Sequence, residues 1–194
     1  MAVVLGQVEY EPIKPWNSGG AGFPRMTRQL EAASKTFKMG VPVKLVSGYL
    51  EECDFSGADI IYGFSTEAAH NLASSGVAQE LSEGTPPNQT AAVITPVGAW
   101  PRDGRCGVYE ANGETVFSIA LKDGEVFTQA LLASGTLYGL TKDGTTGHWF
   151  LDPTDTSGNN AVAILLGMDP SSPNTVAGGC RVFFKVDPTK RFFE

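Results

Sequence analysis

Glycine and proline interrupt this chain along its whole length, and this feature limits the possible folds most. The 194 residues include 23 glycines and 12 prolines. These residues are not pooled in one linker; they separate many short apolar runs that end at Gly, Asn, Asp or Pro. Apolar runs spaced by turn residues at intervals of about 8–12 residues are typical of sandwiches and barrels. The sequence therefore predicts an all-β protein, a β-barrel or β-sandwich with at most short helices.

The clearest local pairing in the first half lies in residues 41–53. VPVKLV alternates between two faces, Ser47 and Gly48 can form a turn, and YLEEC can return as the second strand of a hairpin. The apolar run ADIIYGF at residues 58–64 indicates a further strand.

Two short helices are predicted in the same half of the chain. Residues 27–37, TRQLEAASKTF, are the best helical segment, although their periodic apolar set is small. Residues 65–76 are predicted to be helical because Ser65 or Thr66 can cap the start and Gly76 can end it.

The second half is predicted to be a series of strands. Asn-Gly and Asp-Gly dipeptides separate several of them, and both dipeptides favour hairpin turns. Asn112-Gly113 predicts a hairpin between two of these strands, and KDGTT at residues 142–146 predicts another. The predicted strands are residues 91–97, 106–111, 114–121, 125–133, 137–141, 147–152, 161–168 and 180–186.

Composition changes along the chain suggest three parts. The N-terminal segment is rich in Pro and Gly and cannot bury enough surface to order itself. It is therefore either disordered or an arm that folds against something else. ELSEGTPPNQT at residues 80–90 is the most loop-like interior segment. The predicted parts are an extended N-terminal arm over residues 1–36, a small β-domain over 37–90 and a β-barrel or sandwich over 91–194.

Charge and hydropathy exclude two classes of partner. The net charge of −7 and a pI near 4.8 argue against nucleic acid, because binding its backbone requires clustered Lys and Arg. No run of about 18 apolar residues is present, so a membrane partner is not expected. The N-terminal residues lack the basic start and apolar core of a secretory signal, which predicts synthesis in a cytoplasm.

Three cysteines, Cys53, Cys106 and Cys180, show no CxxC spacing. Disulfide frameworks and tetrahedral zinc sites usually contain closer pairs. We expect three reduced thiols in or near a core; spacing alone leaves a single disulfide possible.

His148 and Asp152 form the sharpest catalytic or metal-binding hypothesis, with Asp143 and Asp155 nearby in sequence. If residues 148–152 form one strand, His148 and Asp152 share a face. Asp152 precedes Pro153, however, and Asp143 lies in a hairpin tip, where aspartate commonly accepts hydrogen bonds from the backbone. The structural interpretation is therefore preferred, and these aspartates are expected to support turns.

No other motif indicates catalysis. His70 has no HExxH partner and is expected to lie on a solvated surface. The chain lacks GxGxxG after a strand, GxxxxGK[ST] and GxSxG, and residues 152–160 resemble a calcium loop only in composition. We therefore predict no catalytic residue, no cofactor and no metal ion, and hence not an enzyme.

Aromatic residues at both ends of the chain are the preferred partner-binding positions. A free monomer is not expected to leave them in water, so burial against other subunits is favoured over a cofactor site. Phe183 and Phe184 alternate across one strand, so one of them needs a cover. The predicted partner-binding residues are Trp16, Phe23, Phe192 and Phe193.

The order of these phrases resembles a known group of proteins. FKMGVPVKLVSGYLEE, then ADIIYGFSTEAA, then a Pro-rich spacer and VITP is similar to the pattern in tailed-phage capsid decoration (cement) and related head-stabilising proteins. YEANGETVFSIAL, LYGLTKDGTTGHWFLDPTDT and the closing pair AVAILLGM and GCRVFFKV also resemble that group. The likeness covers roughly residues 37–187.

This resemblance implies a structural role in the virion. Its members are β-barrel or sandwich subunits that bind the outer capsid surface, often as trimers or dimers, so the implied partners are the major capsid protein and further copies of the chain. Assembly would take place in the host cytoplasm, and no catalytic residue is implied. The alternative is a glycan-binding β-sandwich on a virion or cell surface, with Trp100 or Trp149 as a stacking platform. A hydrolase or metal enzyme around His148 ranks third.

Overall fold

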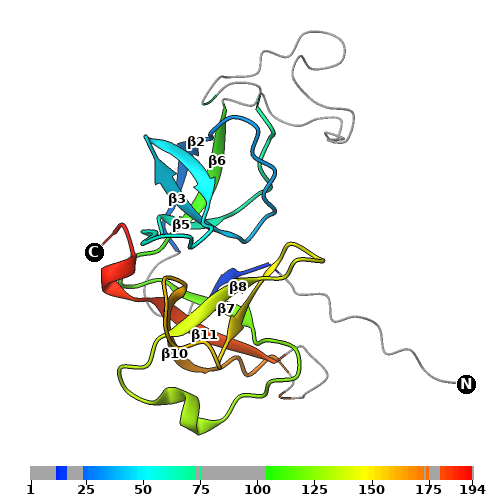
Figure 1. Ribbon diagram of the computed structural model, residues 1–194, viewed down its shortest axis with the longest axis vertical. Coiled ribbons are helices and arrows are strands. Elements are labelled where there is room, and N and C mark those ends of the chain that lie inside the picture. The colour runs from blue at the N-terminus through cyan, green and yellow to red at the C-terminus, as the bar shows by residue number, and fades with distance from the viewer. Residues whose placement is uncertain are drawn as a thin grey trace, which may run out of the picture.

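The structure is a computed structural model that describes residues 12–16, 24–72, 75, 104–172, 174 and 180–193. Its strands form two antiparallel sheets, and the two short helices in the described ranges, Gln129–Leu132 and Pro188–Lys190, are both of the 3₁₀ type (Figure 1). The prediction of an all-β fold with at most short helices is confirmed.

The larger sheet has six strands in the order β1-β7-β11-β10-β8-β9. It forms the lower half of the molecule in Figure 1 and contains most of the chain after residue 115. Its strands are β1 (Lys14–Trp16), β7 (Val116–Ala120), β8 (Tyr138–Lys142), β9 (Trp149–Asp152), β10 (Ala161–Met168) and β11 (Arg181–Val186).

The smaller sheet has five strands in the order β2-β6-β5-β3-β4 and forms the upper half in Figure 1. Its strands are β2 (Met26–Leu30), β3 (Pro42–Val46), β4 (Tyr49–Glu52), β5 (Gly63–Ser65) and β6 (Arg105–Glu110).

Buried side chains from both sheets form one continuous hydrophobic core. At the junction Phe64 of β5 lies 4.4 Å from Phe117 and 5.8 Å from Phe184, measured between ring centroids. All three rings are fully buried. Burying each side chain contributes roughly 1.5–3 kcal/mol, so this contact holds the two sheets together as a sandwich.

Each sheet also curls so that strands far apart in its order meet at an isolated bridge. Leu121, just after β7, bridges Leu151 of β9, and Glu31, just after β2, bridges Leu50 of β4. One bridge does not close a sheet, so the fold is a sandwich of two curled sheets and not a closed barrel.

The described strands change from one sheet to the other after Glu110. β6 pairs with β2 and β5 of the smaller sheet, whereas β7 pairs with β1 and β11 of the larger one. The predicted boundary between residues 90 and 91 lies outside the described residues. Within the segment predicted as an arm, β1 belongs to the larger sheet and β2 to the smaller.

The local hairpins predicted from the sequence are present. β3 and β4 pair around Ser47-Gly48, with Val46 opposite Tyr49. β8 and β9 pair around residues 143–148, with Lys142 opposite Trp149. The closing strands β10 and β11 are also antiparallel neighbours.

The two predicted helices are wrong in the described residues. Residues 27–30 belong to strand β2, which pairs with β6 from Met26↔Tyr109 to Leu30↔Arg105. Residues 66–72 are not helical; the Ala69 amide donates to the Phe37 carbonyl, and the Asn71 amide to that of Lys35. Pairing with distant segments therefore outweighs helical propensity in both places.

Two strand predictions in the second half are also corrected. Asn112-Gly113 does not form a hairpin between β6 and β7, because these strands lie in different sheets. The Asn112 side chain instead accepts hydrogen bonds from the Glu114 and Thr115 amides and shapes the crossover. Residues 125–133, predicted as a strand, contain the 3₁₀ helix Gln129–Leu132, which buries none of its own residues.

Candidate functional site

The C-terminal tail returns to the smaller sheet after the last strand. Asp187 caps the 3₁₀ helix Pro188–Lys190 by accepting a hydrogen bond from the Thr189 amide at 2.8 Å. The Ile61 amide then donates to the Lys190 carbonyl, and the Phe192 amide donates to the Ile61 carbonyl. These bonds fix the tail beside residues 60–62 as a short parallel pairing.

This pairing places aromatic side chains around Tyr62. The Phe192 and Phe193 ring centroids lie 5.3 and 4.8 Å from that of Tyr62, and 5.2 Å from each other. Tyr62 is buried and Phe193 packs against the core, but Phe192 is 56% exposed. Ile60 lies two positions before Tyr62, so in an extended segment the two side chains share a face, and Ile60 is 41% exposed. We call Ile60, Tyr62, Phe192 and Phe193 the tail patch.

Both terminal phenylalanines were predicted to bind a partner, but they differ in burial. Phe193 stabilises the fold from within, whereas Phe192 remains available to another molecule. Tyr62, which supports both rings, was not predicted. The Gln29 amide group donates a hydrogen bond to its hydroxyl at 2.5 Å, so the phenol has a polar partner inside the smaller sheet.

Trp16 and Phe23, the other predicted partner-binding residues, lie in the N-terminal segment. Trp16 ends β1 and packs on Phe183 of β11, with ring centroids 4.2 Å apart. Phe183 is therefore the strand residue that needed a cover, and the chain's own tryptophan supplies it. Trp16 is still 39% exposed. Phe23 lies outside the described residues, and so does Trp100.

The aspartates of residues 141–156 bond to their own turns, as the sequence predicted. Asp143 accepts hydrogen bonds from the Thr146 hydroxyl and amide, which hold the pKa of its carboxyl below the ordinary value. Asp155 accepts from the Asn160 amide group at 2.6 Å. The hairpin tip and the turn after β9 therefore use these carboxylates to satisfy local donors.

Asp152 is nearly buried, and its carboxylate has two partners. It accepts a hydrogen bond from the Thr154 amide and lies 2.7 Å from Lys122 Nζ. Burial raises the pKa of Asp152, but the bonds from Lys122 and Thr154 more than offset this and leave that pKa lowered. His148 directly precedes β9, and its carbonyl accepts a hydrogen bond from the Asp143 amide across the hairpin.

A different histidine lies in a cluster of titratable groups that the sequence did not reveal. His70 was predicted to be solvated, but it is only 6% exposed, so that prediction is wrong. Its Nδ1 atom lies 2.5 Å from Glu31 Oε1, and its Nε2 atom lies 3.6 Å from Glu67 Oε2. We call Glu31, Glu67 and His70 the His70 cluster. The residues span 40 positions and no sequence motif connects them, which explains why they were missed.

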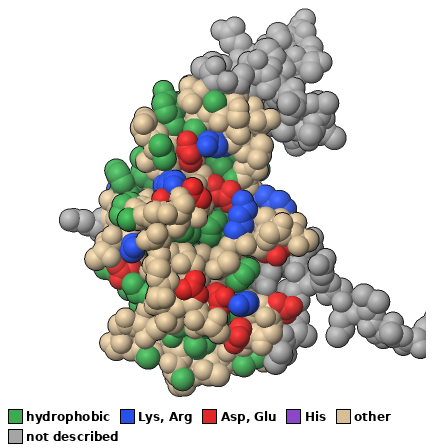
Figure 2. Space-filling view, viewed as in Figure 1, with side chains coloured by type: hydrophobic (Ala, Val, Ile, Leu, Met, Phe, Trp, Pro, Cys, Tyr) green, Lys and Arg blue, Asp and Glu red, His purple; other side chains and the backbone are tan. Residues whose placement is uncertain are grey.

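The described ranges contain no group of three His, Cys, Asp or Glu side chains arranged to hold a metal ion. In the same ranges no helix is both long and apolar enough to cross a bilayer. Acidic and basic side chains alternate over the face shown in Figure 2 and do not form a continuous basic surface there.

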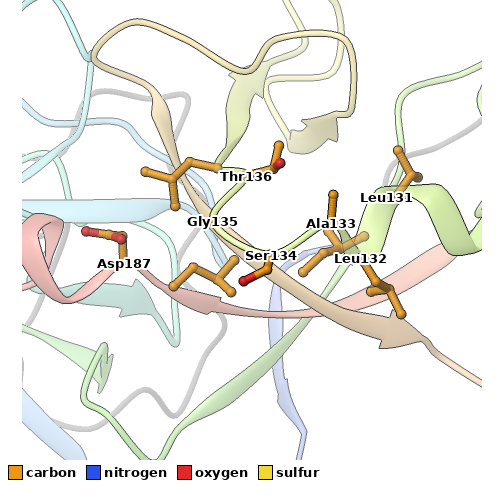
Figure 3. A pocket seen from close by; sticks show the side chains of 10 residues that line it. Leu131, Leu132, Ala133, Ser134, Gly135, Thr136 and Asp187 are labelled. Atoms are coloured by element: carbon orange, nitrogen blue, oxygen red, sulfur yellow. The ribbon is translucent and has the colours of Figure 1, made fainter.

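One open hollow of about 280 Å³ lies between the loop after the first 3₁₀ helix and strand β10 (Figure 3). Leu131 and Leu132 line one end, and Asp187 lies at the other. The Asp187 carboxylate already accepts hydrogen bonds from the Thr189 amide and hydroxyl. Ser134 and Thr136 lie between these ends, so the hollow has both apolar and polar lining residues.

All three cysteines are free and buried. Burial raises the pKa of Cys53 and Cys180 above the ordinary thiol value, which slows reaction with electrophiles because the thiolate is the nucleophile. We expect alkylation without reductant to modify three thiols in denaturant and to be far slower in the folded protein. Intact-mass measurement reports both results. Fewer than three modifications in denaturant would contradict the prediction of reduced cysteines.

The comparisons with known proteins add no relative to this description. The chain matches no protein-family model, and neither the curated proteins nor the solved structures contain a match.

Proposed function

We propose that this protein is a structural component of a phage virion that binds the outer surface of the capsid and stabilises the shell by bridging capsid subunits. The proposed partners are the major capsid protein and further copies of the chain, in a dimer or trimer. In this proposal the protein is not an enzyme and needs no cofactor. The sequence resemblance to capsid decoration proteins supports the class of function.

One structural observation supports the tail patch as the surface that contacts the capsid. Phe192 remains exposed although it lies in a tail that backbone hydrogen bonds fix in place, and Ile60 is exposed in the segment that the tail pairs with. A rigid apolar group loses little conformational entropy when a partner covers it, so most of its burial energy is available for binding. Aromatic side chains of this kind are enriched at the centres of protein interfaces.

A weak contact on each copy is sufficient for a protein that binds a capsid as an oligomer. Burying one phenylalanine side chain contributes roughly 1.5–3 kcal/mol. An oligomer that presents several tail patches to neighbouring capsid subunits gains affinity through effective concentration. Repeated weak contacts can therefore hold the protein on a capsid without a large interface on each copy.

The glycan-binding alternative has less support. Trp149, one of its two proposed stacking platforms, is only 4% exposed, and its indole Nε1 donates to Glu52 at 2.9 Å. Trp100 lies outside the described residues. No exposed tryptophan face with neighbouring polar groups is present in the described ranges, apart from Trp16, which stacks on Phe183.

We expect Phe192→Ser to weaken cosedimentation with undecorated capsids by about fourfold or more, since a partner can cover only the exposed part of a ring whose full burial contributes roughly 1.5–3 kcal/mol. The free energy of unfolding should change by about 0.5 kcal/mol or less, because the side chain is already largely in water. Denaturant unfolding measured by circular dichroism checks this second expectation.

Val46→Ser is the matched control, because Val46 is an exposed apolar residue at the tip of the β3–β4 hairpin. It should cosediment like the unmodified protein. Equal cosedimentation of the Phe192 variant would remove the tail patch from the proposed contact. If the unmodified protein failed to bind capsids but bound a glycan array, the alternative function would replace this one.

A further inference from the structure

The His70 cluster connects three separate segments of the smaller sheet. Glu31 directly follows β2, His70 and Glu67 belong to residues 66–72, and Glu67 reaches β6. Glu31 Oε2 accepts a hydrogen bond from the His70 amide at 2.9 Å, and Glu67 Oε1 accepts one from the Gly107 amide at 2.9 Å. Each carboxylate therefore uses one oxygen for a backbone amide and turns the other toward the imidazole.

The charge of the imidazole decides whether both carboxylates are satisfied. A neutral imidazole carries one N–H and can donate to only one of them, whereas the protonated ring carries two donors and a positive charge. Burial alone favours the neutral ring. Glu31, however, is fully buried, and a buried carboxylate that loses its countercharge is more unfavourable still.

The other titratable groups nearby do not replace this positive charge. Cys106 of β6 is fully buried, and burial followed by the charges of Glu31 and Glu67 raises the pKa of its thiol, so the thiol stays neutral. The charge of Arg28 on β2 also lowers the pKa of Glu67, as the weakest of the causes that do so. The hydrogen bond from His70 is the largest cause that lowers the pKa of Glu67.

We propose that the His70 cluster is a pH-dependent latch, which fastens residues 66–72 to β2 and β6 while His70 carries both ring protons and releases them when it loses one. Other bonds remain after this release. The Ala69 and Asn71 amides still donate to the carbonyls of Phe37 and Lys35. Deprotonation should therefore loosen this segment locally and leave the two sheets folded.

The direction of the effect follows from proton linkage. In the proposal the folded protein holds the His70 proton more tightly than the unfolded chain does, where an imidazole titrates near about 6.5. The stabilisation is then fully present below that pH and is lost as the pH rises through the titration midpoint of the folded protein.

The first test is a titration of the full-length protein by NMR between about pH 5 and pH 10. The chain contains two histidines, so His148, which is more exposed, is an internal control. We expect the His70 midpoint to lie above about 6.5, the midpoint of an imidazole in an unfolded chain. A His70 midpoint at or below 6.5 would overturn the proposal.

The second test is amide hydrogen exchange on both sides of that midpoint. After correction for intrinsic rates, the His70 and Gly107 amides, which donate to the two carboxylates, should exchange about tenfold faster per pH unit above it, and those of β3 and β4 should not change. His70→Gln should abolish this pH dependence, and His148→Gln should retain it. If His70→Gln does not fold, the unmodified protein still decides the question, because equal exchange on both sides of the midpoint contradicts a latch.

Discussion

Phe64→Ala should destabilise the protein by about 3–5 kcal/mol, the usual range for removing a fully buried phenylalanine. The ring lies between Phe117 and Phe184, so its loss opens a cavity where the two sheets meet. Both neighbours are themselves fully buried and have no solvent-facing position to move into. Denaturant unfolding followed by circular dichroism and by tryptophan fluorescence measures the loss.

The two probes also test whether the sheets unfold together. Trp149 belongs to the larger sheet and Phe64 to the smaller, so a shared core predicts that fluorescence and circular dichroism report one coincident transition. Phe193→Leu serves as a milder control, because its ring is only partly buried. A loss below about 1 kcal/mol for Phe64→Ala, or two separated transitions, would contradict a core shared by both sheets.

The elements that could be predicted from the sequence are those whose partners lie close along the chain. The β3–β4 hairpin has alternating residues on both sides of Ser47-Gly48, and β8–β9 surrounds an Asp-Gly pair. In such hairpins the turn and the pattern favour the same register, so local information is sufficient.

The errors occur where a distant segment determines the conformation. Residues 27–30 have helix-forming side chains, yet their partner is β6, almost 80 positions later, and its backbone bonds hold them extended. Asn112-Gly113 has the composition of a hairpin turn but marks the crossover between the sheets. A single sequence does not contain the information to choose between these outcomes.

The candidate sites show the same division. The aspartates of residues 141–156 each accept a hydrogen bond from within a few positions, and this role could be predicted, whereas the ion pair of Asp152 with Lys122 could not. Phe192 was predicted to bind a partner from its position near the end of the chain, and the structure leaves it 56% exposed. The supporting contact with Tyr62, and the three-segment His70 cluster, depend on the tertiary fold and have no local signal.

Ile13→Ala should destabilise the protein by about 2–5 kcal/mol, because the side chain is 3% exposed and belongs to the shared core. This expectation revises the view of the N-terminal segment as an attachment arm. Arg181 Nη2 donates to the Pro12 carbonyl at 3.2 Å, and β1 pairs with β7 from Lys14↔Ser118 to Trp16↔Val116. Residues 12–16 are thus a structural edge of the larger sheet.

A substitution at Gly40 tests the packing of Pro12 and Ile13 independently. A Cβ atom there would lie 2.6 Å from Pro12 Cβ and 2.7 Å from the Ile13 amide nitrogen, and its φ of +76° already disfavours other residues. Gly40→Ala should therefore also destabilise the protein, by about 1–3 kcal/mol, as expected where a side chain meets backbone and the backbone is strained.

Lys14→Ala is the matched control on the same strand, because that side chain is exposed and should change the free energy of unfolding by about 0.5 kcal/mol or less. The loss of stability in Trp16→Ala should lie between those in Ile13→Ala and Lys14→Ala. This variant uncovers Phe183, but it removes a ring that is already 39% exposed. Urea unfolding of the four variants measures this order. If Ile13→Ala and Gly40→Ala unfolded like Lys14→Ala, residues 12–16 would not be part of the folded core, and an arm that orders only on a partner would again be the better description.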